Sequence, residues 1–332
     1  MTKIPTPDDL KAAFAVTRLA TLVTPLLDSE RLRAATGARH FYVKAENLQR
    51  AGSFKLRGAS WRLTQLDAGE RARGVVAYSS GNFAQGLAAA GRDQGVPVTI
   101  VMPDDAPEMK RRATEGFGAR VVLSHHGVRP REEAASELAS AMAREHGLVL
   151  LHPFDDPLIV AGQAGAALEA FEQIGQVPDV AVCPVGGGGL MGGVSLALRA
   201  ANPAAQIWAV EPEGYDGMGA SLRSGNRLRV AGGSTICDAL QATMPGDAPF
   251  AACQFAGVQG LAVSDAEVAR ALRVAFEELK LVLEPSGAVA LAAVLAGRVP
   301  VEGRNVLVFA TGGNIAFDRF ASLVANATGL DA

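Results

Sequence analysis

Lys55 carries the most distinctive chemistry in the sequence, because it is a single amine set among apolar neighbours. It follows a Gly-Ser turn in the segment Gly52-Ser53-Phe54-Lys55-Leu56. Desolvation lowers the pKa of a lysine, and an amine that is neutral near pH 7 can form a Schiff base with an aldehyde. Taken alone, the same segment also suits a lysine that is solvated at the surface.

Two loops further along the chain could bind anions. The loop Ser79-Ser80-Gly81-Asn82-Phe83 follows the run GVVAY, and its hydroxyl and N–H groups could hold a substrate carboxylate. Asn82 could also donate to a phenolate oxygen. The loop Gly186-Gly187-Gly188-Gly189-Leu190 lacks Cβ atoms, so successive N–H groups could approach a phosphate at a helix start. An ordinary helix cap and turn is the alternative for the first loop.

Two late turns carry further polar groups. One is Glu284-Pro285-Ser286-Gly287-Ala288, and the other is Thr311-Gly312-Gly313-Asn314. A neutral hydroxyl at Thr311 could face a heterocyclic nitrogen, whereas a carboxylate there would force that nitrogen to protonate. Each turn, taken alone, also suits a structural role.

The glycine-rich loop also satisfies a dinucleotide-binding pattern. Gly187, Gly189 and Gly192 match GxGxxG after a predicted strand, and Glu211 follows about 20 residues later. An NAD(P)-dependent dehydrogenase with a Rossmann fold is therefore an alternative from these residues alone. This alternative assigns no common role to the lysine segment and the other polar turns.

The elements that must position these residues are alternating strands and helices, typical of βα units in a parallel sheet. The predicted strands are GVVAY, PVTIVM, ARVVLS, LVLLHPF, DVAVCPV, QIWAV and NVLVFA. The predicted helices include REEAASELASAMAREHG, DPLIVAGQAGAALEAFEQIG ending at Gly175, and one opened by a capping box of Ser264 and Glu267. Ligands of open α/β sheets bind beyond the carboxyl ends of the strands, where these unusual turns lie.

The length and net charge of the chain indicate which kinds of ligand it could bind. The 332 residues are enough for two lobes around more than one core. The net charge of -3 gives no broad electrostatic reason to bind nucleic acid or an anionic membrane. No run approaches the roughly 18 apolar residues that span a bilayer, and the three cysteines form no CxxC pair. We expect a cytoplasmic protein with reduced thiols and a small-molecule ligand.

Taken in order, the segments SFKLRGA, SSGNFAQG, PVGGGGL, EPSGA and TGGN resemble the fold-type II pyridoxal-phosphate enzymes. Within them, the chain is most similar to the threonine/serine dehydratase and serine racemase group. The segments Thr24-Pro25-Leu26 and KAENLQ extend the likeness to about residues 24–314. The resemblance implies an α/β fold, tryptophan synthase β-like, with two open, mostly parallel twisted sheets flanked by helices.

The resemblance also implies a division into two domains and a set of site residues. Residues 1–50 and 150–332 would form a large cofactor-binding domain, and residues 51–149 a small domain carrying the SSGN loop. The implied catalytic residues are Lys55 and Ser80. The implied residues for pyridoxal 5′-phosphate are Phe54, Lys55, Asn82, Gly186, Gly187, Gly188, Gly189, Leu190, Glu284, Thr311 and Gly312. The implied substrate-binding residues are Ser79, Ser80, Gly81, Asn82 and Phe83.

Three positions depart from the family pattern. Phe83 stands where dehydratases of this group usually have His, which makes the pocket more apolar. Thr311 stands where Ser is frequent and retains the hydroxyl. Glu211 matches the glutamate of a VEP cation motif, but Asp216 is not spaced as expected for its partner. These two residues could bind Mg²⁺, Mn²⁺ or a monovalent cation. The alternative is that both are solvated carboxylates without a bound ion.

The histidines show no zinc-ligand spacing. His125 and His126 are adjacent, and adjacent residues of a strand point to opposite faces. We therefore expect the five histidines to have structural or surface roles.

The implied function is a dehydratase, or ammonia-lyase, that converts L-threonine, L-serine or a related β-hydroxy amino acid to a 2-keto acid and ammonia through an aminoacrylate. Lys55 would remove the α-proton, and the cofactor phosphate is one candidate proton donor for the departing hydroxyl. A serine or hydroxyaspartate racemase is an alternative, because racemases of this group have serine at the position of Ser80. We expect a homodimer. The sequence does not select among threonine, serine, 3-hydroxyaspartate and an aryl-serine.

Overall fold

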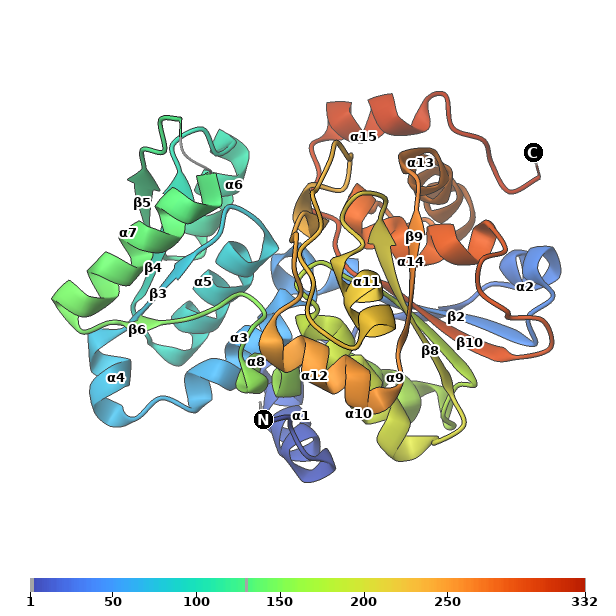
Figure 1. Ribbon diagram of the computed structural model, residues 1–332, viewed down its shortest axis with the longest axis horizontal. Coiled ribbons are helices and arrows are strands. Elements are labelled where there is room, and N and C mark those ends of the chain that lie inside the picture. The colour runs from blue at the N-terminus through green and yellow to red at the C-terminus, as the bar shows by residue number, and fades with distance from the viewer. Residues whose placement is uncertain (1–2, 129–130, 332) are drawn as a thin grey trace.

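Two sheets flanked by helices make up residues 3–128 and 131–331, the part of the chain that the computed structural model describes (Figure 1). Within these residues, a six-stranded sheet has the order β1-β2-β10-β7-β8-β9 and a four-stranded sheet the order β5-β4-β3-β6. The pairing of β1 with β2 is antiparallel, and the other pairings are parallel. The predicted fold class is confirmed.

The six-stranded sheet is buried on both faces. Its strands are β1 (Leu26–Asp28), β2 (His40–Ala45), β7 (Val180–Pro184), β8 (Gln206–Pro212), β9 (Gln259–Val263) and β10 (Asn305–Ala310). In β10, Val306 and Val308 belong to one apolar core, and Leu307 and Phe309 belong to another. Successive side chains of a strand point to opposite faces, so the helices on both faces pack against this strand.

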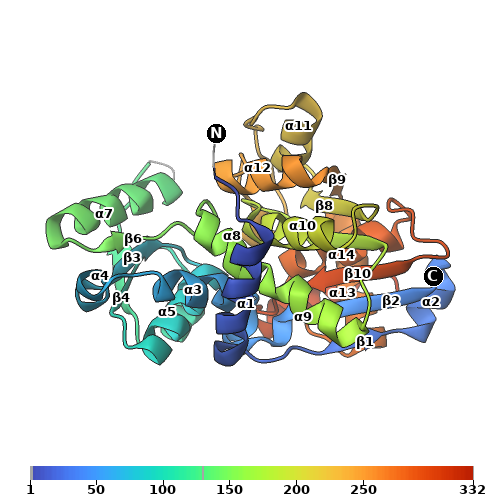
Figure 2. The ribbon, with the colours of Figure 1, turned by 90° about the horizontal axis from the view of Figure 1, so that it is seen from below.

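The helices around this sheet cover one face or the other. The face toward Val306 carries α2 (Glu30–Thr36), α13 (Asp265–Val274) and α14 (Pro285–Leu295). The opposite face carries α1 (Pro7–Ala20), α8 (Pro157–Gln163), α9 (Gly165–Ile174), α10 (Gly189–Ala201) and α12 (Asp247–Ala256), and Figure 2 shows α1 beside α8 and α9. The remaining helices and turns are η1 (Glu46–Leu48), η2 (Arg50–Gly52), α11 (Gly217–Ser224), η3 (Asp238–Leu240), the π-helical η4 (Ala275–Leu279) and α15 (Phe317–Val324).

The four-stranded sheet has its own two cores. Its strands are β3 (Val75–Tyr78), β4 (Val98–Pro103), β5 (Arg120–Ser124) and β6 (Val149–Leu150). One core lies under α3 (Lys55–Thr64) and α5 (Asn82–Gln94), and the other under α7 (Arg131–His146). The helices α4 (Ala68–Arg73) and α6 (Glu108–Gly116) complete this part of the molecule.

Two local signals in the sequence are confirmed, whereas one predicted strand and one predicted helix differ from the structure. The predicted strand LVLLHPF is reduced to the two residues of β6, Val149–Leu150. The capping box of Ser264 and Glu267 opens α13, and α9 ends at Gly175 in the left-handed conformation with φ 72°. The helix predicted to end there is divided at Ala164 into α8 and α9. Helix α10 lies close to α8 near this division. A Cβ atom on Gly193 of α10 would lie only 2.5 Å from the Val160 carbonyl oxygen of α8.

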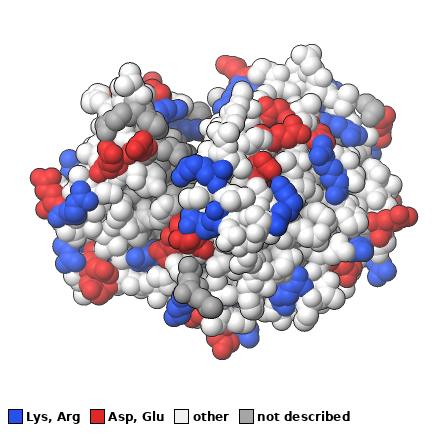
Figure 3. Space-filling model, viewed as in Figure 1, with Lys and Arg blue, Asp and Glu red and all other residues white. Residues whose placement is uncertain are grey.

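Charged side chains of both signs are interspersed over the face seen in Figure 3, in keeping with the small net charge. Among the described helices, we find none with the length and apolar character that crossing a bilayer requires.

Candidate active site

A cavity of about 250 Å³ lies where the loops of the two sheets meet. It is lined by loops that follow the carboxyl ends of β3, β7 and β10, where ligands of open α/β sheets bind. The predicted site residues that line it are Phe54, Lys55, Ser79, Ser80, Gly81, Asn82, Phe83, Gly186, Gly187, Gly188, Gly189, Leu190, Glu284 and Thr311. Gly312 lies directly behind this lining, and Glu211 and Asp216 lie outside it.

Lys55 begins α3 and directs its amine into the cavity. Its Nζ donates to the Pro153 carbonyl oxygen at 3.1 Å and lies 5.2 Å and 5.8 Å from the ring centroids of Phe54 and Phe83. Burial lowers the pKa of Lys55 to about 8, and the nearby Glu284 carboxylate opposes this shift. The neutral fraction of the amine near physiological pH is therefore much larger than that of an exposed lysine, and condensation with an aldehyde requires the neutral form.

The lysine segment is held against the last turn of the site. Ser53 and Gly312 form an antiparallel bridge, and the Phe54 N–H donates to the Thr311 carbonyl oxygen at 3.3 Å. A Cβ atom on Gly312 would lie 2.2 Å from Glu284 Oε1, so only glycine fits this position. The hydroxyl-bearing Thr311 is buried beside the cavity.

Asn82 is fixed from two sides at the start of α5. Its Nδ2 donates to Glu284 Oε1 at 2.5 Å, and its Oδ1 accepts from Asn314 Nδ2 at 2.8 Å. Asn314 also donates to the Ala51 carbonyl oxygen at 2.9 Å. Burial raises the pKa of Glu284 to about 7, whereas the bond from Asn82 acts in the opposite direction. The sequence did not single out Asn314, although it closes the TGGN motif.

The glycine loop has no room for side chains. Gly188 caps α10 in the left-handed conformation with φ 96°, which favours glycine. A Cβ atom on Gly187 would lie 2.3 Å from the Phe154 ring, and one on Gly188 would lie 2.6 Å from Met218 Cε. The first N–H groups of α10 have no partner within the helix and, with the helix dipole, favour an anion at this end of the cavity.

Residues 17–312 match the family model described as pyridoxal-phosphate dependent enzyme. The chain belongs to this family. It is 39% identical to the L-threo-3-hydroxyaspartate ammonia-lyase of Saccharomyces cerevisiae, over 91% of this chain and 90% of that protein. It is 41% identical to the L-threonine ammonia-lyase of Thermotoga maritima, over 93% of this chain and 76% of that protein. Its fold matches maize serine racemase with a TM-score of 0.90 at 31% identity, covering 96% and 97% of the two chains.

The cavity of this pyridoxal-phosphate enzyme fits the cofactor of its family. It offers an amine with a lowered pKa, a side-chain-free loop at a helix N-terminus and a buried neutral hydroxyl at Thr311. The dinucleotide interpretation of the glycine loop is wrong. Glu211, which would bind a ribose in that interpretation, lies outside the cavity lining.

Glu211 has its carboxylate directed at a helix start. Its Oε1 and Oε2 accept from the N–H groups of Met218 and Gly219, both at 2.8 Å. Burial raises the pKa of Glu211 to about 8. Asp216 instead pairs with Arg223 at 3.5 Å. The cation site at Glu211 and Asp216 stays a prediction.

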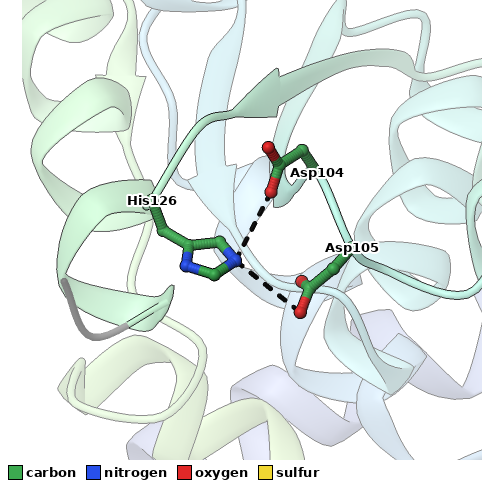
Figure 4. A group of neighbouring side chains, drawn as sticks. All are labelled: Asp104, Asp105 and His126. Carbon is green, nitrogen blue, oxygen red and sulfur yellow. Dashed lines mark ion pairs between the residues drawn. The ribbon is translucent and has the colours of Figure 1, made fainter. Parts of the chain in front are cut away.

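The adjacent histidines do not point apart, which corrects the expectation from strand geometry. They follow the end of β5, and both reach Asp104. His125 Nδ1 lies 2.6 Å from Asp104 Oδ2. His126 Nε2 lies 3.4 Å from Asp104 Oδ1, as Figure 4 shows. Asp104, Asp105 and His126 bring their ligand atoms within 4.8 Å of one another, so they could hold a metal ion. Asp105 also pairs with Arg131 at 2.9 Å. This group is outside the cavity lining.

A buried ion network behind Lys55 was missed in the sequence. Arg57, two residues after Lys55 on α3, donates to both carboxylate oxygens of Glu46 at 2.7 and 2.8 Å and to those of Glu169 at 2.8 and 3.2 Å. Lys44 donates to Glu169 at 2.6 Å. These side chains are buried, so the network fixes α3 against β2 and α9.

The cavity also has lining residues that no motif indicated. Lys110 on α6 pairs with Asp238 on η3 at 3.0 Å, which joins the two parts of the molecule beside the cavity. Tyr78 and Phe154 add two aromatic rings to the lining.

Proposed function

We propose that this enzyme is an ammonia-lyase that eliminates the hydroxyl group of a β-hydroxy amino acid and releases a 2-keto acid and ammonia. The observation that carries the proposal is one cavity that combines the Lys55 amine, the polar Ser79–Asn82 loop and the glycine loop at the start of α10. The relatives named as ammonia-lyases for L-threonine and L-threo-3-hydroxyaspartate support this class of reaction.

We assign the residues that would hold the cofactor by chemical fit. Lys55 would bond to its aldehyde carbon, and Gly186–Leu190 with the start of α10 would bind its phosphate. The Thr311 hydroxyl would serve the ring nitrogen, and Asn82 would donate to the ring oxygen. Glu284, Phe54 and Gly312 complete this side of the cavity by holding Asn82, the lysine and the final turn in place. When bound, the cofactor supplies the conjugated system that accepts electrons from the substrate α-carbon.

The remaining chemistry belongs to the protein. Lys55, as a neutral amine, takes the α-proton, and its pKa of about 8 suits a general base near neutral pH. The hydroxyl and N–H groups of residues 79–82 bind the substrate carboxylate. Phe54 and Phe83 flank the amine and limit the water around it.

The test is the release of 2-keto acid and ammonia by the purified holoenzyme. L-threonine, L-serine, L-threo-3-hydroxyaspartate and phenylserine are supplied separately, because the side-chain specificity is open. Lys110 gives the cavity a second cation that could meet a side-chain carboxylate, and Phe83 gives it an apolar surface that could meet an aryl ring. Turnover of at least one of the four supports the proposal. Stable binding without any keto acid would contradict it.

Racemisation is the second candidate, and Ser80 is the residue that favours it. Ser80 lines the same cavity as Lys55, so its hydroxyl and the amine are two groups that could exchange the α-proton. Formation of D-serine from L-serine, followed on a chiral column, tests this activity. Ser80→Ala should then remove racemisation and leave keto acid release in place.

We also infer a homodimer. Leu22, Val23, Leu48 and Val282 are between 45% and 65% exposed. The Gln49 side chain bonds to both backbone groups of Leu22, and Asn47 donates to the Val282 carbonyl oxygen, so these apolar side chains belong to neighbouring segments. Val23→Glu should reduce the mass measured by light scattering from that of a dimer to that of one chain.

We also propose a division into two domains and a cellular compartment. Residues 51–149 would form the small domain and residues 1–50 and 150–332 the large one; positions 1–2, 129–130 and 332 lie outside the described residues. The cysteines Cys183, Cys237 and Cys253 are buried and free, which supports a reducing compartment such as the cytoplasm.

A further inference from the structure

Tyr78 is a residue of the cavity lining beside the substrate-binding loop. It is the last residue of β3, immediately before Ser79, and it also packs against the core under α7. The Tyr78 hydroxyl lies 3.2 Å from His152 Nε2, and the two rings meet edge to face. This position is the carboxyl end of a strand, where reacting groups of open α/β sheets lie.

The backbone fixes the tautomer of His152. Its Nδ1 accepts from the Asp155 N–H at 2.9 Å and from the Phe154 N–H at 3.4 Å, so Nδ1 carries no proton. Burial lowers the pKa of His152, which keeps the ring neutral and leaves its one proton on Nε2. His152 Nε2–H therefore donates to the Tyr78 oxygen, and the phenolic proton is directed away from His152.

Residues 152–154 connect this phenol with the general base and the glycine loop. His152 holds Tyr78, the carbonyl oxygen of Pro153 holds the Lys55 amine at 3.1 Å, and the Phe154 ring packs against Gly187 of the glycine loop. Three consecutive residues thus set the relative positions of the phenol, the amine and the phosphate-binding loop. The His152 side chain is also within electrostatic influence of Lys55.

We propose that Tyr78 donates the proton that the β-hydroxyl of the substrate needs as it leaves, an inference that rests on the proposed ammonia-lyase function. Lys55 takes the α-proton, and the electron pair of that bond forms the bond between the α- and β-carbons. The β-carbon–oxygen bond breaks with its electrons on oxygen, which receives the Tyr78 proton and departs as water. The phenolate is held by His152 Nε2–H and regains a proton from solvent as the product leaves.

A change of leaving group tests this role. Hydroxide needs a proton to leave, whereas chloride does not, so L-serine and β-chloro-L-alanine differ in the step assigned to Tyr78. Wild type, Tyr78→Phe and a control, Tyr215→Phe, are compared as holoenzymes. The Tyr215 hydroxyl donates to the Gly233 carbonyl oxygen at 2.8 Å near the surface, outside the cavity lining. Binding of unreactive L-alanine, followed by the visible spectrum, reports whether the site stays intact.

We expect Tyr78→Phe to affect turnover of the two substrates differently. Tyr78→Phe should lower kcat for L-serine about 100-fold or more, the usual contribution of a positioned acid. Its kcat for β-chloro-L-alanine and its affinity for L-alanine should stay within about twofold of wild type. Equal losses with both substrates, or no loss with L-serine, would overturn the role of Tyr78. Inactivity of wild type with all β-hydroxy amino acids would instead overturn the function itself.

Discussion

The Asn82 side chain donates to the Glu284 carboxylate at 2.5 Å, joining residues 202 positions apart in the sequence. Asn82 begins α5, which packs on the four-stranded sheet, and Glu284 caps α14, which packs on the six-stranded sheet. The bond therefore crosses the cavity from one sheet system to the other. It also places a buried carboxylate whose charge acts on the Lys55 amine.

Glu284→Gln should change the pH dependence of cofactor attachment. The ionised carboxylate raises the pKa of Lys55, so its removal lowers that pKa below about 8 and increases the neutral fraction of the amine. Because the pKa of Glu284 is itself raised to about 7, the effect should appear above pH 7 and fade below it, where wild type carries a neutral carboxyl. The rate of colour formation after adding pyridoxal phosphate to the apoprotein measures this.

The exposed Glu213 offers the control for that experiment. Glu213→Gln removes one negative charge outside the cavity lining and should leave the pH dependence unchanged. Slower attachment above pH 7 in Glu284→Gln would mean that the carboxylate has a different effect on the amine.

Lys55→Ala should abolish turnover and the absorbance of the lysine-bound cofactor. Borohydride reduction of the wild-type holoenzyme should label only the peptide that contains Lys55. Lys110→Ala is the matched control, because Lys110 is another lysine of the cavity lining but is paired with Asp238. Its peptide should carry no label in wild type, and Lys110→Ala should remain coloured. A label on Lys110 would reassign the cofactor lysine.

The sequence predicted the parts of the site that depend on local or motif-like patterns. Ser264 and Glu267 cap a helix through bonds three residues apart, so four residues contain the whole signal. The loops around Asn82, Gly188 and Thr311 follow strands, and parallel strands bring such loops to one edge. The strands β1, β2 and β9 were missing from the predicted strands. In β9, the glycine in Gln259–Val263 weakens the strand signal.

The remaining contacts depend on tertiary positions that no local pattern encodes. Arg57 meets Glu169 across 112 residues, and Tyr78 meets His152 across 74. The expectation for His125 and His126 failed because they follow Ser124, the last residue of β5, so the alternation of a strand does not apply to them.

Gly187→Ala should weaken binding of pyridoxal phosphate. The added methyl group would lie 2.3 Å from the Phe154 ring, which must move, and Phe154 lines the cavity. Overpacking of this kind costs about 1–3 kcal/mol, so we expect binding to be weaker by roughly 5-fold to 150-fold in an equilibrium titration. Gly116→Ala is the control, since a Cβ atom there meets nothing within 4 Å. Adding Phe154→Ala to Gly187→Ala should recover part of the affinity, and no recovery would exclude the clash as the cause.

Arg57→Met should be strongly destabilising, because it leaves two buried carboxylates with a single cation. Glu46 and Glu169 would then share only Lys44, and all four side chains are buried. Breaking such a network by removing one partner costs about 3–5 kcal/mol. Urea unfolding of the apoprotein measures the loss without any contribution from the cofactor.

The exposed pair of Arg18 and Glu172 provides the comparison for Arg57. Arg18→Met breaks an ion pair of 3.3 Å whose side chains are about half exposed, and it should cost less than about 1 kcal/mol. Adding Glu46→Gln to Arg57→Met restores the charge balance, since Lys44 then faces Glu169 alone. The double variant should therefore be more stable than Arg57→Met. If it is less stable, the lost packing and hydrogen bonds of the guanidinium, rather than the uncompensated charge, account for the destabilisation.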